Sequence, residues 1–347
     1  MAWIFVYLAT RREDLDPGPV NRSPRRPAAV REWAMQQCAD AVLMVRPKAF
    51  GYNPDTAASN TFQKDDGAAP DEVQALASEE FGQLARALGS EGVEVCVAED
   101  SATPEKPDAV FPNNWLSFHA DGTLVLYPLQ GANRRAERRQ EVIDAAVKAL
   151  GFKVTHLIDL THHEGQGRFL EGTGSLVLDH LHRTAYACAS PRTHPELVAE
   201  WARELRYEPV VFEATNRGGV ALYHTNVLMC IGERFVVIAS EAVVRRDRER
   251  VLKSLRSSGR DVLEIGHTEL ERFAGNMLEL GTWDEALGDS RVLVMSESAR
   301  RALKPETYAR LSGCTDTVLA VPVPTVETQG GGSVRCMLAE VFRPAPA

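Results

Sequence analysis

The sequence predicts an α/β fold in which five similar strand-helix-strand units close into a ring. Three observations predict this fold. An amphipathic helix runs into a short apolar strand five times, these junctions recur about every 50 to 60 residues, and a second apolar strand follows each junction. A unit of this size cannot bury its apolar face alone, whereas five units in a ring bury it without leaving free ends.

Each helix is predicted from apolar residues at helical spacing. In the first, Val73, Leu76, Phe81 and Leu84 share one face, and Gly89 stands where the helix would end. The predicted helices span 71–88, 134–150, 195–205, 243–255 and 298–311. The strands predicted to follow them span 93–97, 152–155, 209–212, 262–265 and 317–321.

The second strands begin near residues 114, 174, 226, 276 and 333, and polar or glycine residues stand at each beginning. We call these five beginnings the strand mouths. A ring brings all five mouths to one central end, so residues distant in sequence can form one site. The mouths carry different side chains, which is expected of a functional site built on a pseudosymmetric scaffold.

Residues 36–347 are expected to form a single domain, and residues 1–35 a poorly ordered extension rich in Pro and Arg. The apolar run at 3–9 is too short to span a bilayer. It also lacks the preceding positive charge of a signal peptide. Six cysteines without a Cys-x-x-Cys pair argue against a zinc ribbon or a redox motif and favour a reducing, cytoplasmic location.

The composition also restricts the partners. A net charge of −9 argues against nucleic acid and against an anionic membrane surface. The sequence contains no Walker loop and no dinucleotide fingerprint. We therefore expect a small-molecule substrate, and whether the chain forms a homo-oligomer is left open.

Three mouths carry side chains suited to nucleophilic catalysis. Cys336 follows three consecutive glycines that let backbone amides approach a reacting centre. His224 stands at the third mouth and has a proton affinity suited to a general acid or base. Glu171 stands at the second. Alone, each has an ordinary structural alternative: a buried strand cysteine, a satisfied polar histidine and a turn glutamate.

Together, the segments 107–115, 170–175, 223–226 and 330–336, with 46–53 and 60–63, resemble the guanidine-modifying (amidinotransferase, or pentein) superfamily. The chain is most similar to its citrulline-utilisation hydrolases, which are related to arginine deiminases. The resemblance covers about residues 38–343. It implies a fivefold pseudosymmetric β/α propeller and a hydrolase of C–N bonds other than peptide bonds that needs no metal or organic cofactor.

The resemblance also implies the roles of individual residues. Cys336 would be the nucleophile, His224 the general acid and base, and Glu171 the carboxylate that contacts a substrate nitrogen and orients the histidine. The expected substrate-binding residues come from the first mouth, from the segment before Glu171 and from the glycine run: Asp108, Phe111, Asn113, Asn114, Arg168, Gly332 and Arg335. Arg168 and Arg335 could grip a substrate carboxylate.

Asn113 and Asn114 stand where arginine-handling relatives carry acids. A cationic guanidinium offers only donors and favours carboxylates, whereas a neutral ureido group also has a carbonyl acceptor that an Asn amide can satisfy. We therefore expect conversion of citrulline to ornithine, carbon dioxide and ammonia through a covalent Cys336 intermediate. Hydrolysis of arginine or dimethylarginine, amidino transfer and a non-catalytic binding propeller remain alternatives.

Two further clusters are expected to lie in solvent. His162 and His163, with His156, Asp159 and Glu164 nearby, lack the helical spacing of a metal site, so we expect a loop and no metal. The pairs at 134–135 and 138–139 are expected to form an exposed basic helix face.

Overall fold

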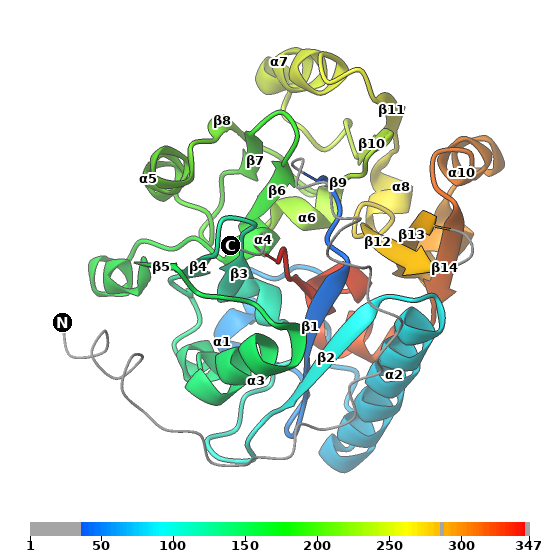
Figure 1. The fold of residues 1–347 in the computed structure, drawn as a ribbon. Helices are drawn as coiled ribbons and strands as arrows, with labels where there is room; N and C mark the ends of the chain where they lie inside the picture. The colour runs from blue at the N-terminus through cyan, green and yellow to red at the C-terminus, as the bar shows by residue number, and fades with distance from the viewer. Residues whose placement is uncertain (1–35, 285–287, 344–347) are drawn as a thin grey trace.

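Five three-stranded sheets surround a common centre in the structure, a computed structural model that describes residues 36–284 and 288–343. Figure 1 shows the helices α2 (Pro70–Ser90), α3 (Gln140–Leu150), α5 (Pro195–Leu205), α7 (Arg245–Arg256) and α10 (Pro305–Ser312) around the outside of these sheets. The predicted fivefold propeller is confirmed. The prediction for residues 1–35 lies outside the described residues.

Four of the sheets share one topology, in which an antiparallel hairpin is followed by a helix and a third strand parallel to the middle one. The repeating unit is therefore strand-strand-helix-strand, and the sequence prediction missed the middle strand of each unit. The four sheets consist of β3 (Leu116–Phe118), β4 (Thr123–Leu126) and β5 (His156–Asp159); β6 (Leu176–Asp179), β7 (Thr184–Cys188) and β8 (Glu208–Phe212); β9 (Met229–Ile231), β10 (Phe235–Ile238) and β11 (Asp261–Glu264); and β12 (Leu278–Asp284), β13 (Gly288–Ser296) and β14 (Thr317–Val321).

The fifth sheet closes the ring, because it takes strands from both ends of the described chain. β1 (Ala41–Arg46) pairs in parallel with β2 (Glu94–Glu99) and antiparallel with β15 (Ala339–Glu340). Leu43 lies opposite Ala339 in this pairing and is fully buried. Pairing the two ends gives the first and last described strands a neighbour in the ring.

Three predicted elements differ from the observed ones. The helix predicted at 298–311 is two helices, α9 (Glu297–Ala302) and α10, since the ring of Pro305 forces the preceding Lys304 into an extended conformation. The helix predicted at 134–150 begins as a separate 3-10 turn, η3 (Asn133–Glu137), and continues as α3 only from Gln140. The strand predicted at 152–155 starts four residues later, as β5.

Single helical turns stand at the strand mouths, where strands were predicted to begin. They include η2 (Pro112–Asn114), α4 (Gly172–Ser175), α6 (Thr225–Leu228) and η6 (Val334–Met337). Glycines let neighbouring turns touch. A Cβ on Gly172, whose φ is +48°, would lie 2.2 Å from the Asn113 carbonyl oxygen, and one on Gly275 would lie 2.5 Å from that of Val227. The mouths therefore meet backbone to backbone.

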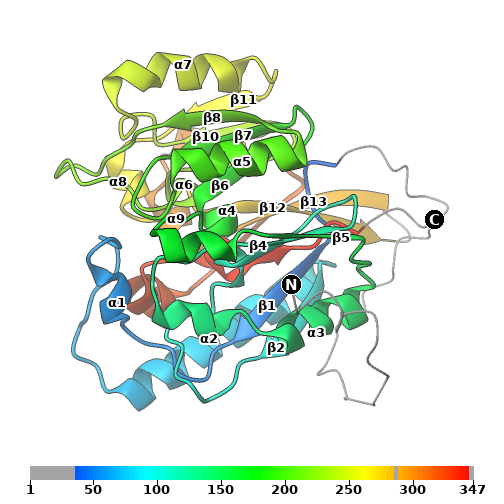
Figure 2. The ribbon, with the colours of Figure 1, turned by 90° about the vertical axis from the view of Figure 1, so that its left-hand side faces the viewer.

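Further short helices border the mouths or join the sheets: α1 (Pro54–Ala57), α8 (His267–Leu270), the 3-10 turn η4 (Thr161–Gln166) and the π-helical turn η5 (Val326–Gly330). In the side view of Figure 2, α1 and α8 lie at the same end of the ring. Within 36–284 and 288–343, no helix combines the length and the apolar character needed to span a membrane.

The closing strand pair should be essential to stability. Replacing the fully buried Leu43 with Ala removes apolar packing between β15 and β2, and we expect it to lower the free energy of unfolding by about 2–5 kcal/mol. Leu76→Ala, at a position 44% exposed on α2, is the matched control and should change it by less than about 0.5 kcal/mol. Denaturant titration measures both, and equal losses would contradict the role given to ring closure.

Candidate active site

The strand mouths enclose one small cavity to which residues from separate parts of the chain contribute. Cys336 and His224, which are 112 positions apart in the sequence, line this cavity together. The ring therefore joins the predicted nucleophile and the predicted acid-base group in one space. Its remaining lining is Asn60, Asp108, Phe111, Asn114, Arg134, Arg192, Tyr223 and Gly330 to Gly332.

The sulfur of Cys336 lies buried between two amide side chains. Asn276 Nδ2 is 3.3 Å from Sγ, and Asn226 Nδ2 is 3.6 Å from it. Asn276 is itself fixed, because its Nδ2 also donates to the Asn226 carbonyl oxygen (2.8 Å) and its Oδ1 accepts from the Arg335 backbone N–H (3.1 Å). Asn226 Oδ1 also lies 3.8 Å from Sγ, so this amide can accept from the thiol as well as donate to the sulfur, whereas Asn276 only donates. An N–H donor stabilises negative charge that develops on the sulfur. Both residues stand at strand mouths, but sequence reasoning gave them no role.

Glu171 and His224 form a buried hydrogen-bonded pair, with 2.8 Å between Oε2 and Nε2. Burial by itself would raise the pKa of Glu171, but Arg192 at 3.4 Å, the bond from His224 and Arg134 at 3.7 Å together hold that pKa well below its usual range. The other carboxylate oxygen of Glu171, Oε1, accepts from the Gln130 backbone N–H at 2.9 Å. Glu171 is therefore an ionised acceptor that fixes the histidine ring.

His224 is uncharged at neutral pH. Burial lowers its pKa to about 4, and the neighbouring Glu171 offsets only part of this effect. An ionised carboxylate can only accept, so Nε2 carries the ring hydrogen and Nδ1 keeps a lone pair. The pair thus presents a neutral imidazole that can take up a proton at Nδ1.

Arg134 corrects the prediction of an exposed basic helix face. Its side chain is buried, and its guanidinium donates to both carboxylate oxygens of Glu137 (2.8 and 3.0 Å) and to Asn114 Oδ1 (3.0 Å). Asp108 Oδ2 lies 3.5 Å from Nε of Arg134. Arg135 and Arg138 are half-buried and pair with Glu164. The segment turns inward because buried acids require cationic partners.

The orientation of the Asn114 amide follows from Arg134. Since a guanidinium only donates, Asn114 must turn Oδ1 toward it and Nδ2 away. Nδ2 donates to Asn113 Oδ1 at 3.0 Å and retains a second hydrogen. Asn113 lies behind Asn114, fully buried, and its Nδ2 has no hydrogen-bond partner within the described part of the chain. The first mouth therefore presents an amide donor to the cavity.

Arg192, which sequence reasoning missed, also lines the cavity. Its guanidinium donates to Ser59 Oγ and to the Thr56 carbonyl oxygen, both at 3.0 Å, and lies 5.0 Å from the ring centre of Tyr223. Asp108, another lining residue, accepts from Asn53 Nδ2 at 2.7 Å. Nothing local in the sequence marks Arg192, because its partners lie far away along the chain.

The glycine run before Cys336 is closely packed. Asn60 Nδ2 donates to the Gly330 carbonyl oxygen at 3.0 Å, and the Tyr223 hydroxyl donates to that of Gly331. A Cβ on Gly332 would lie 2.9 Å from the Phe111 ring and 3.3 Å from Cβ of Cys336. The predicted residues Phe111 and Gly332 therefore contact each other beside the nucleophile. Asn60 belongs to the segment 60–63 that carried the family resemblance.

Two predicted substrate-binding residues do not reach the cavity. Arg168 is half-exposed, and its guanidinium contacts Gln166. Arg335 is buried, but its guanidinium points away from the cavity to the Leu338 carbonyl oxygen (2.9 Å) and Glu340 (2.8 Å). Adjacent residues of a helical turn point in different directions. The position of Arg335 next to Cys336 in the sequence therefore wrongly suggested that its side chain reaches the cavity. Neither side chain is among the residues that line the cavity.

Comparison with known proteins identifies the family and the fold. The family profile described as "N,N dimethylarginine dimethylhydrolase, eukaryotic" matches residues 46–343. No curated protein sequence matches the chain. Among solved structures, the N-terminal domain of ArgZ, an arginine dihydrolase of cyanobacteria, has a TM-score of 0.66 at 17% identity and covers 88% of this chain and 99% of its own. The chain spans only 41% of full-length ArgZ.

A dimethylarginine dimethylaminohydrolase structure has a TM-score of 0.57 at 17% identity, with 87% of this chain and 99% of the other covered. At such identities these structures establish the fold alone. Fold and profile together define an enzyme of the guanidine-modifying superfamily, a hydrolase of C–N bonds other than peptide bonds. The chain belongs to the N,N-dimethylarginine dimethylhydrolase family. The presence of Cys336 and His224 in one cavity, with Glu171 bonded to the histidine, argues against the non-catalytic binding propeller.

The amide pair at the sulfur should control how fast Cys336 reacts. Asn276→Ala removes one donor, and we expect alkylation by iodoacetamide at pH 7 to slow about tenfold, which corresponds to about 1.4 kcal/mol. Burial raises the pKa of Cys96, Cys188 and Cys230 to about 12, so these thiols react slowly. Asn216→Ala, in an exposed turn, is the control. Unchanged labelling in Asn276→Ala would refute the role of the amide.

The buried state of His224 should appear in acid unfolding. Its pKa is about 4 in the folded chain and about 6.5 when unfolded, so the unfolded chain binds more protons between these values. The associated stability is present above pH 6.5 and is lost as the pH falls toward 4, at up to about 1.4 kcal/mol per pH unit. Denaturant titration at several pH values should show a shallower decline for His224→Asn. His156→Asn, at an exposed position, should keep the wild-type slope. Parallel curves for wild type and His224→Asn would contradict a buried neutral imidazole.

Proposed function

We propose that this enzyme hydrolyses the ureido group of citrulline through a covalent intermediate on Cys336. The supporting observation is the fixed amide of Asn114, which offers an N–H donor where a guanidinium would require an acceptor. A ureido carbonyl oxygen accepts such a hydrogen bond, whereas every guanidinium nitrogen competes with it as a donor.

The charges around the cavity support the same substrate. The carboxylates of Asp108 and Glu171 already lie beside the guanidinium groups of Arg134 and Arg192. A cationic substrate would enter next to two buried cations, and both of these acids are already paired with them, which is unfavourable at low effective dielectric. A neutral ureido group avoids that repulsion.

In the first half of the reaction, the neutral His224 takes the thiol proton while Sγ adds to the ureido carbon. The amides of Asn226 and Asn276 stabilise the sulfur as it gains charge. The resulting imidazolium is stabilised by Glu171 and returns the proton to the departing δ-nitrogen. Ornithine leaves, and a carbamoyl thioester remains on Cys336.

In the second half, a water molecule gives a proton to His224 and attacks the thioester carbon. The C–S bond breaks, and the sulfur recovers the proton from the imidazolium. The released carbamate decomposes to carbon dioxide and ammonia. Overall, citrulline and one water become ornithine, carbon dioxide and ammonia, and no group outside this chain is needed to balance the step.

Arginine or dimethylarginine hydrolysis is the second candidate, and two observations favour it. The structural relatives include an arginine dihydrolase and a complex of AgrE with L-arginine. In addition, Asp108 and Glu171 could both contact a cation if substrate binding moved Arg134 or Arg192.

Product analysis separates the candidates. Purified enzyme incubated with citrulline, arginine or dimethylarginine should release ornithine and ammonia from citrulline fastest. Cys336→Ser should lose at least about 1,000-fold in rate. Cys314→Ser, at a half-exposed cysteine away from the cavity, should keep wild-type activity. Release of citrulline from arginine as the fastest reaction would replace the proposal with the second candidate. Transfer of the group to an added amine instead of water would indicate an amidinotransferase.

Asn114→Asp should shift specificity toward cationic substrates. The new carboxylate keeps its contact with Arg134, and Asn113 can turn its unpartnered Nδ2 to donate to it. We expect kcat/KM for citrulline to fall about 100-fold and the arginine-to-citrulline ratio to rise at least tenfold. Asn114→Ala removes the donor without adding charge, so it should lower citrulline turnover and leave arginine turnover no higher. A citrulline preference that survives in Asn114→Asp would disprove the amide's role.

A further inference from the structure

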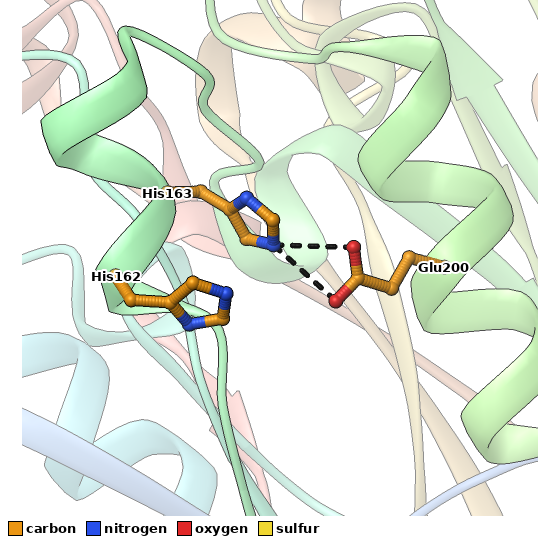
Figure 3. Close-up of side chains that lie close together, drawn as sticks. All are labelled: His162, His163 and Glu200. Carbon is orange, nitrogen blue, oxygen red and sulfur yellow. Dashed lines mark hydrogen bonds and ion pairs between the residues drawn. The ribbon is translucent and has the colours of Figure 1, made fainter.

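Outside the catalytic cavity, His162, His163 and Glu200 bring two imidazoles and a carboxylate together. The histidines lie on η4, and Glu200 lies in the middle of α5. One ligand atom from each residue lies within 4.8 Å of the other two. Figure 3 shows the two rings side by side, with Glu200 facing them from the neighbouring helix.

The spacing suits a small divalent cation. His163 Nε2 lies 3.1 Å from Glu200 Oε2 and 3.3 Å from Oε1. In a tetrahedral zinc site with bonds of about 2.0 Å, neighbouring ligand atoms are about 3.3 Å apart. The distance between His163 Nε2 and the Glu200 carboxylate therefore already matches that between two neighbouring zinc ligands. His162 is exposed, so the space around its ring allows the small shift that closes the remaining gap.

The ring of His162 is oriented as a metal ligand requires. Its Nδ1 lies 3.1 Å from the Asp159 carbonyl oxygen. A carbonyl oxygen only accepts, so Nδ1 carries the hydrogen and Nε2 keeps its lone pair. Figure 3 shows this second nitrogen turned toward Glu200. Metal-binding histidines commonly use one nitrogen for such a backbone contact and the other for the ion.

His163 is the rigid member of the group. It is 4% exposed, its ring lies 4.0 Å from that of His162 between centroids, and its Nδ1 has no hydrogen-bond partner among the residues that the structure describes. A buried imidazole held against a carboxylate loses little freedom when it binds an ion. The exposed His162 would then complete the site.

We propose that His162, His163 and Glu200 bind one Zn²⁺ ion, with water at the fourth position. Two imidazole nitrogens and one carboxylate oxygen match the ligand preference of zinc. The sequence prediction of a solvated loop did not include Glu200, which is 37 positions from His163 and joins it only through the fold.

The ion would brace one wall of the catalytic cavity. The chain runs from η4 to Glu171 and from Arg192 into α5, and the Glu171 N–H donates to the Arg192 carbonyl oxygen at 3.2 Å. A second bond joins the His194 N–H to the Phe169 carbonyl oxygen at 2.9 Å. Zn²⁺ would connect the two elements that carry these residues, without contacting the reacting groups.

Zinc binding is best measured on the full chain carrying Cys336→Ser, because the catalytic thiol could itself hold zinc. After chelator treatment, equilibrium dialysis should show one high-affinity Zn²⁺ per chain. His162→Ala and Glu200→Gln should each weaken this binding at least tenfold. The exposed His162 can be changed without opening the core. His156→Ala and Glu204→Gln, at exposed positions on β5 and α5, are the matched controls and should bind as the parent does.

Thermal unfolding is a second test of zinc binding. At a Zn²⁺ concentration about 100 times the dissociation constant, the parent should gain a few degrees in Tm, and the double variant His162→Ala/Glu200→Gln should gain none. The proposal is overturned if the double variant binds Zn²⁺ as tightly as the parent. It is equally overturned if the parent binds none. Neither result depends on which substrate the enzyme hydrolyses.

Discussion

Two arginine side chains, Arg134 and Arg192, lie buried at the centre of the ring next to the carboxylates of Asp108 and Glu171. Charges removed from water are tolerated only when they are paired and hydrogen-bonded. This constraint explains why η3 turns inward and why Glu171 stays ionised. It also explains why the Asn114 amide has one fixed orientation. The catalytic geometry and the expected preference for a neutral substrate both follow from it.

The ring of five sheets brings the side chains of the candidate active site together. Asp108, Glu171, His224 and Cys336 occupy mouths of different sheets, and each mouth is a short helical turn that precedes a strand. Close contacts between turns at Gly172 and Gly275 leave little space at the centre. The pairing of β1 with β15 then holds the last turn, which carries Cys336, against the first. Positioning by the scaffold thus supplies the alignment of reacting groups that the proposed reaction needs.

The sequence predicted most of the architecture, because the change from helical to strand spacing recurs at every unit. It missed middle strands such as β4 and β10, since runs of three or four apolar residues have no distinguishing period. Cys336, His224 and Glu171 were predicted because each stands at a mouth and because the segments that carry them together resemble the family. Arg192 and Glu200 could not be found, because their partners meet them only in the folded chain. Arg168 and Arg335 were misplaced by their proximity to catalytic residues in the sequence.

The nature of the covalent intermediate tests the central claim most directly. Enzyme mixed with citrulline, quenched in acid within a turnover and digested should carry a carbamoyl group on the peptide containing Cys336, as measured by mass spectrometry. The same experiment with arginine should leave that peptide largely unmodified. An amidino adduct from arginine that accumulates faster than the carbamoyl adduct from citrulline would contradict the account, because the buried arginines would then not exclude a cationic substrate.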